Sequence, residues 1–185
     1  MLEKVNTLFV DKTGTLTLGK PQVTDVITLG KFEIEEIVQL AASAERYSEH
    51  PLAKAVVRYA ESRAIVINDV KDFRSTPGIG VEAKIGQLAI KVSNQVENLS
   101  KSDERQVSEL LENGKTVFFI QVDEKTEGVI AAEDEPRKDV KNAIKQLKSN
   151  GIQRIILISG DRKPVVRKLA GELEIDYHAD LLPED

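Results

Sequence analysis

Three short apolar runs constrain the fold more than any other feature of the sequence: residues 7–10 (TLFV), 154–159 (RIILIS) and 175–178 (IDYH). Uninterrupted apolar runs of this length are typical of buried parallel strands. Helical patterns flank the second run at 136–151, which ends in a glycine, and at 161–174. The alternation of helices and strands predicts an α/β domain of the doubly wound type. Its first strand would pair with strands more than a hundred residues later in the chain.

The residues between these runs follow another pattern. Residues 21–29 alternate like a strand with one exposed face, and helical patterns follow at 33–46, 51–63 and about 103–113. Short segments divided by glycine or acidic turns are typical of an antiparallel meander, and they lie at 78–86, 88–93, 116–123 and 126–133. We therefore predict an inserted α+β domain with an antiparallel sheet at 20–130. The α/β domain would comprise residues 1–19 and 131–185.

Composition excludes several classes of function. The 185 residues are 41% hydrophobic and 31% charged, which is the balance of a soluble globular protein. The chain has no cysteine and two histidines, so it can form neither a disulfide nor a thiolate metal site. A net charge of -5 argues against binding nucleic acid. No apolar run approaches the roughly 18 residues of a membrane span. We expect a monomer.

Acidic residues follow two of the predicted strands. Asp11 follows the first strand, and Asp161 follows the second in the sequence Ser159-Gly160-Asp161. Ligands of open parallel sheets bind beyond the carboxyl ends of the strands, so both carboxylates could reach one crevice. Lys12 and the small polar residues around Asp11 would form a phosphate cradle. A carboxylate in such a cradle can attack a phosphoryl group, although an Asp after a strand is more often a turn former.

The seven residues Asp11–Thr17, DKTGTLT, favour the catalytic interpretation. They resemble the phosphorylation signature of P-type ATPases, which share the haloacid-dehalogenase-like fold. This resemblance implies that Asp11 is the nucleophile and binds Mg²⁺, to which Thr13 adds its backbone carbonyl. It also implies that Lys12, Ser159, Gly160 and Asp161 belong to the catalytic site. Phosphatases of this fold often carry a second Asp where this chain has Thr13, and threonine is a poor base for hydrolysing an acyl phosphate.

The sequence Asp134-Glu-Pro-Arg137 resembles the hinge element of the same family, near the nucleotide and the domain junction. The resemblance therefore implies that Asp134 and Arg137 contribute to nucleotide binding. A short motif of this kind also fits a solvated loop with an exposed ion pair.

The inserted domain resembles the nucleotide-binding domain of the heavy-metal-transporting subgroup. The sequence Ser48-Glu-His50-Pro matches an element of that subgroup in which the histidine orients adenine. Glu45 matches its adenine-contacting glutamate and could accept a hydrogen bond from the exocyclic amine. Taken alone, His50 would be an ordinary capping or core residue, and Glu45 would be a solvated one.

Two further segments complete this resemblance. Gly78 and Gly80 match a Gly-x-Gly loop whose backbone approaches the triphosphate, although such a loop alone fits a tight turn. Asn94 matches the asparagine of a Gly-Asn pair. The chain has Ser93 in place of that glycine, which brings the shape of the loop into question.

The resemblance covers nearly the whole chain but only part of such a pump. After the final LLPED, the family continues with a phosphate-contacting lysine and a Gly-Asp-Gly-x-Asn-Asp loop. We therefore expect a soluble catalytic core that binds ATP or ADP but hydrolyses ATP poorly by itself. Its partners would be the membrane and actuator domains of the parent pump, and it would lie on the cytoplasmic side of the membrane.

Three functions stay open at this point. The first is the ATP-binding and phosphorylation core of a heavy-metal-exporting ATPase. Copper is the first expectation for its ion, with zinc, cadmium, lead and cobalt as alternatives. The second is a free-standing phosphatase of the same superfamily, and the third is a non-catalytic nucleotide-binding regulator.

Overall fold

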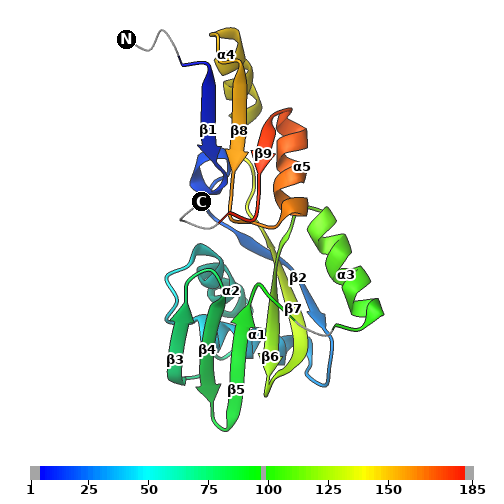
Figure 1. Ribbon diagram of the computed structural model, residues 1–185. Helices are drawn as coiled ribbons and strands as arrows, with labels where there is room; N and C mark the ends of the chain where they lie inside the picture. The colour runs from blue at the N-terminus through cyan, green and yellow to red at the C-terminus, as the bar shows by residue number, and fades with distance from the viewer. Residues whose placement is uncertain (1–4, 97–98, 182–185) are drawn as a thin grey trace. The chain divides into compact units, whose positions relative to one another are not determined.

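The computed structural model describes residues 5–96 and 99–181 (Figure 1). Contacts divide the chain into two compact units. The first contains Met1–Lys20, Leu111–Thr116 and Asp134–Asp185, and the second contains Pro21–Leu110 and Val117–Glu133. The chain therefore leaves the first unit after residue 20 and rejoins it twice. The last four residues of the LLPED stretch, 182–185, lie outside the described residues.

A parallel sheet forms the centre of the first unit. Its strands are β1 (Thr7–Asp11), β8 (Arg154–Ile158) and β9 (Asp176–His178), in that order. The register joins Thr7 to Arg154 and Asp11 to Ile158. This pairing confirms the prediction that the first strand lies beside a strand from far along the chain. It also places the carboxyl ends of β1 and β8 at the same edge.

Helices α4 (Val140–Ser149) and α5 (Lys163–Leu173) connect these strands and contact each other. Both contribute to one apolar cluster with Leu157 of β8. Because β1, β8 and β9 follow one another in chain order, right-handed connections place both helices on the same face of the sheet. Val10 of β1 packs on that cluster. The neighbouring Phe9 points to the opposite face of the sheet, and its side chain is 58% exposed.

A six-stranded antiparallel sheet forms the second unit, in the order β2-β7-β6-β5-β4-β3. The strands are β2 (Gln22–Thr28), β3 (Lys71–Thr76), β4 (Gly80–Ile85), β5 (Leu88–Ser93), β6 (Thr116–Val122) and β7 (Lys125–Glu133). Helices α1 (Ile34–Glu45) and α2 (Pro51–Ser62) pack on one face. The fully buried Ala41, Ala42 and Ala44 let α1 approach the strands closely.

Strand β3 was absent from the sequence prediction. Its residues, KDFRST, are exposed except for the partly buried Phe73, and the strand lies at an edge of the sheet. An edge strand with one apolar side chain has no alternating pattern to detect. The predicted helix near 103–113 is α3, Lys101–Glu112. The other predicted helices and strands are present, with ends that differ by a few residues.

Candidate functional site

The catalytic residues expected in the first unit lie at the carboxyl edge of its sheet. Asp11 is the last residue of β1 and pairs with Ile158, the residue just before the turn 159–161. Its side chain is exposed. Lys12 follows and is buried. The parallel pairing of β1 with β8 therefore brings the Asp11 backbone and the 159–161 turn to the same edge.

Lys12 forms an ion pair with Asp161, and only 7% of Lys12 is exposed. The Ser159 hydroxyl donates to the Asp161 carboxylate at 3.0 Å, and the Asp161 amide donates back to the Ser159 Oγ at 3.1 Å. The Thr116 hydroxyl donates to the other carboxylate oxygen at 3.4 Å. A buried ammonium is tolerated only with such a partner, so Asp161 fixes the position of Lys12.

Thr116 was missed as a candidate residue. It is the first residue of β6. The sequence around it has no motif that distinguishes it from other threonines in strands. Gly160 lies in the same turn, between Ser159 and Asp161. A Cβ atom there would lie 3.0 Å from the carbonyl oxygen of Leu181, so the chain itself occupies part of that space.

Residues 134–137 fix the loop after Asp11 through hydrogen bonds. The Asp134 carboxylate accepts from the Thr17 hydroxyl at 2.6 Å and from the amides of Gly19 and Lys20 at 3.1 and 3.0 Å. The Arg137 guanidinium donates to the carbonyls of Thr15 and Gly14 at 3.1 and 3.0 Å. Asp134 and Arg137 thus orient the loop that follows Asp11. Their predicted contact with a nucleotide stays a prediction.

In the second unit, three of the expected nucleotide-binding residues lie together. The Asn94 side-chain amide donates to the Gly78 carbonyl at 3.1 Å, and the Asn94 backbone amide donates to the Ile79 carbonyl at 3.1 Å. Gly80 has φ +151°, and a Cβ atom there would lie 2.0 Å from the carbonyl oxygen of Val92. No side chain fits at that position. Asn94 and the neighbouring strand therefore fix the shape of the Gly-x-Gly loop.

Ser93 occupies the place where the subgroup has glycine. Its hydroxyl donates to the Gln95 carbonyl at 2.6 Å, and its φ is not positive. The serine therefore needs no conformation reserved for glycine. It pairs in register with Gly80, so the loop and the end of β5 stay joined.

Glu45 and His50 lie at either end of the turn between α1 and α2. His50 caps α2, and its Nδ1 accepts from the Leu52 amide at 3.4 Å, so the neutral ring carries its proton on Nε2. The Ser48 backbone amide donates to the Glu45 carbonyl at 2.9 Å. The turn therefore brings two of the expected adenine-contacting residues close together.

Only 7% of Glu45 is exposed, and its buried Oε2 atom finds no hydrogen-bond partner in the part of the chain that the structure describes. Burial raises the pKa of this carboxyl to about 7, and a hydrogen bond from the Ser48 hydroxyl offsets part of the effect. A side chain that would be solvated at an ordinary helix end is therefore held in an apolar environment. Carboxyls with such pKa values are concentrated at functional sites.

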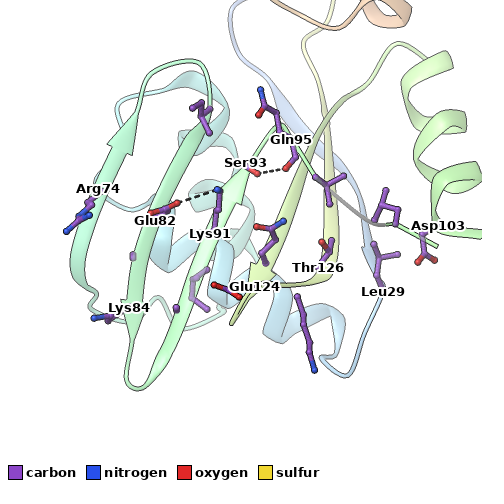
Figure 2. A pocket seen from close by; sticks show the side chains of 18 of the residues that line it. Leu29, Arg74, Glu82, Lys84, Lys91, Ser93, Gln95, Asp103, Glu124 and Thr126 are labelled. Carbon is purple, nitrogen blue, oxygen red and sulfur yellow. Dashed lines mark hydrogen bonds and ion pairs between the residues drawn. The ribbon is translucent and has the colours of Figure 1, made fainter. Parts of the chain in front are cut away.

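A groove of about 1210 Å³ lies elsewhere in the second unit (Figure 2). Glu82 of β4 and Lys91 of β5 line it and form an ion pair at 3.4 Å, which Figure 2 shows as a dashed line. Ile79 and Ser93 also line the groove, whereas Glu45 and His50 do not. The groove therefore touches the Gly-x-Gly region but is distinct from the turn between α1 and α2.

Among the described residues, no group of three or more His, Cys, Asp or Glu side chains could hold a metal ion. The expected Mg²⁺ ligands, the exposed Asp11 carboxylate and the Thr13 carbonyl, are both oxygen atoms. Mg²⁺ is usually held in proteins by one or two such ligands together with water and substrate phosphates. These residues therefore fit a magnesium ion that arrives with a phosphate compound.

Comparisons with known proteins agree with this geometry. The family of haloacid dehalogenase-like hydrolases matches residues 5–185. The chain belongs to this family. It is 40% identical over 178 residues to copper-exporting P-type ATPase B of Archaeoglobus fulgidus. The matched region covers 95% of this chain and 26% of that protein. The chain spans about a quarter of the length of the curated relatives it matches.

Solved structures show the same relationship. The catalytic domain of the CPx-ATPase CopB-B matches 100% of the chain at 33% identity with a TM-score of 0.78, and 64% of that domain is covered. A zinc-transporting PIB-type ATPase matches 100% of the chain at 33% identity with a TM-score of 0.69, and 30% of it is covered. The chain is therefore homologous to the catalytic part of P-type ATPases, with an inserted antiparallel-sheet domain.

Within residues 5–96 and 99–181, none of the helices is long and apolar enough to cross a bilayer.

We predict that Asp134→Ala lowers the free energy of unfolding by about 2 kcal/mol or more, because three donors lose a charged acceptor. Urea denaturation measures this difference. Glu135→Ala is the matched control, since that exposed neighbour engages the loop through its backbone carbonyl, which the substitution keeps. Equal losses in the two variants would contradict a specific role for the Asp134 carboxylate.

We also predict a pH-dependent effect of Glu45→Gln. The folded-state pKa is raised from 4.5 to about 7, so the wild type loses stability as pH rises through this window. Glutamine does not ionise. The stability of the variant relative to wild type should therefore increase by up to about 3 kcal/mol between the two ends of the window.

Urea denaturation of both proteins at several pH values measures this increase. Glu49→Gln is the control, because Glu49 is exposed and Lys54 lowers its pKa, so the rise should be absent. A stability difference between Glu45→Gln and wild type that is independent of pH would show that the Glu45 carboxyl is not desolvated.

Proposed function

We propose that this chain is the ATP-binding and aspartyl-phosphorylation core of a heavy-metal-exporting P-type ATPase, with copper as the transported ion. In the intact pump, hydrolysis of ATP through a phosphorylated Asp11 would drive metal across the membrane. The observation that carries the proposal is the position of the DKTGTLT loop. Asp11 ends β1 with its carboxylate exposed, while Asp134 and Arg137 fix the loop behind it.

The second unit is the nucleotide-binding domain in this proposal. Glu45 and His50 would contact the adenine, and the backbone around Gly78 and Gly80 would approach the phosphates. Asn94 supports this assignment because it holds that loop through the Gly78 carbonyl. ATP and ADP would both bind here, since the adenine contacts are common to them.

Phosphoryl transfer would occur in the first unit. A carboxylate oxygen of Asp11 would attack the γ-phosphorus, the bond from that phosphorus to the ADP oxygen would break, and an acyl phosphate and ADP would form. Lys12, positioned by Asp161, would add positive charge beside the transferred group, and the Ser159 hydroxyl would be available to a phosphoryl oxygen. Mg²⁺ held by Asp11 and the Thr13 carbonyl would offset negative charge on the phosphoryl oxygens.

The membrane and actuator domains of the parent pump would be the partners of this core, which would face the cytoplasm. The copper assignment follows the relative in Archaeoglobus fulgidus, whose name states copper export. Zinc is the alternative ion, because a structure of a zinc transporter is also similar. Growth of a strain that expresses the parent gene, compared in medium with added copper and in medium with added zinc, distinguishes the two ions.

We predict that His50→Ala weakens ATP binding by roughly 3- to 10-fold, the effect of losing one hydrogen bond of about 1 kcal/mol. Isothermal titration calorimetry measures the dissociation constants. His178→Ala is the control, because this exposed histidine ends β9 in the first unit. Equal affinities of wild type and His50→Ala would refute the adenine role of His50.

The phosphatase alternative predicts a different activity. A phosphatase would hydrolyse a generic ester such as p-nitrophenyl phosphate in a reaction that depends on Asp11. We expect no hydrolysis above the rate of Asp11→Asn, because Thr13 stands where a second carboxylate would activate water. Phosphate release well above that background would favour the phosphatase.

A further inference from the structure

The carboxyl of Glu45, in the proposed adenine site, is buried. It is 7% exposed, and its Oε2 atom has no hydrogen-bond partner among the described residues. An ionised carboxylate in this position would keep one oxygen away from water, and the described residues give it no ion-pair partner. A neutral carboxylic acid avoids that cost and has one donor and one acceptor on adjacent oxygen atoms.

Strands β4 and β5 turn apolar side chains toward α1. Helix α1 contacts β4 and β5, whose core-facing side chains include Val81, Ala83 and Val92. The charged residues Glu82 and Lys91 alternate with them, face the opposite side of the sheet and pair with each other. The core side of these strands is therefore apolar beneath the helix.

The ionisable residues next to Glu45 in the chain are engaged elsewhere. Arg46 forms an ion pair with Asp69 at 2.5 Å. Glu49 forms one with Lys54 at 2.6 Å, and the His50 ring caps α2. Among the described residues, the Ser48 hydroxyl is the one side chain that favours the ionised form of Glu45, and burial outweighs it, which raises the pKa to about 7.

The two protonation states would recognise different bases. The Watson–Crick edge of adenine presents the N6 amine as donor beside N1 as acceptor. A neutral carboxyl matches both, through C=O···H–N6 and O–H···N1. An ionised carboxylate offers two acceptors, which meet the N6 amine but face the N1 lone pair. Two acceptors instead match the N1–H and N2–H donors of guanine.

We propose that Glu45 reads the nucleobase as a neutral carboxylic acid, so that binding of an adenine nucleotide favours the protonated residue and disfavours 6-oxopurines. The proposal rests on the nucleotide-binding function assigned above to the second unit. It adds a specific hydrogen bond to N1 and a link between nucleotide affinity and pH.

Calorimetric titration of ATP into wild type and Glu45→Gln between pH 6 and pH 8.5 tests the link. Glutamine keeps one donor and one acceptor but does not titrate, so the ratio of the two affinities isolates the titration of Glu45 from that of groups common to both proteins and of the nucleotide phosphates. With a free carboxyl that titrates at about pH 7, the wild-type affinity relative to the variant should fall roughly tenfold from pH 6 to pH 8. Wild type should also take up close to one more proton than the variant at pH 8.

A second ligand tests the hydrogen bond itself. In 1-deaza-ATP a C–H group replaces N1, so this analogue should bind wild type roughly 5- to 10-fold more weakly than ATP at pH 6, and GTP should also bind more weakly. A flat or rising affinity ratio with pH, or equal binding of ATP and 1-deaza-ATP, would overturn the neutral carboxyl while leaving nucleotide binding intact. If wild type binds ATP at no pH, the proposed function fails, and this assignment fails with it.

Discussion

The parallel pairing of β1 with β8 is the contact on which the first unit depends. It joins Thr7–Asp11 to Arg154–Ile158, although an entire second unit lies between them in the chain. Closing so long a loop costs conformational entropy, but that cost grows slowly with loop length. The burial of Leu157 and the helices against β8 offsets it. Once the pairing forms, Asp11 and the Ser159–Asp161 turn emerge at one edge with no further arrangement required.

Lys12 and Glu45, two of the buried charged residues, are accommodated in opposite ways. Lys12 is compensated by Asp161, which in turn accepts hydrogen bonds from Ser159 and Thr116. Burial raises the pKa of Glu45 instead, because the described part of the chain supplies one hydroxyl partner and no counter-ion. The first arrangement keeps a fixed positive charge beside the proposed nucleophile. The second favours a neutral acid where a base is proposed to bind, which suits recognition rather than charge stabilisation.

The Asp134–Arg137 segment shows how a motif can be recognised before its physical role is known. Its resemblance to a family hinge predicted a place near the nucleotide. Its contacts in the structure are with Gly14, Thr15 and Thr17 of the DKTGTLT loop, through a charged acceptor and a forked donor. Four residues thereby hold a loop that begins more than a hundred positions earlier. Neither segment contains a sequence pattern from which its contact with the other could be predicted.

The sequence alone determined the strands with uninterrupted apolar runs, the helices with apolar stripes, and the DKTGTLT and Ser-Glu-His-Pro motifs, because these signals are local. It did not reveal β3, whose exposed edge position requires no apolar pattern. The tertiary structure alone decided that Thr116 supports Asp161 and that Glu45 is buried. Burial and pairing depend on which distant segments come into contact. The residues next to a side chain in the sequence do not determine those contacts.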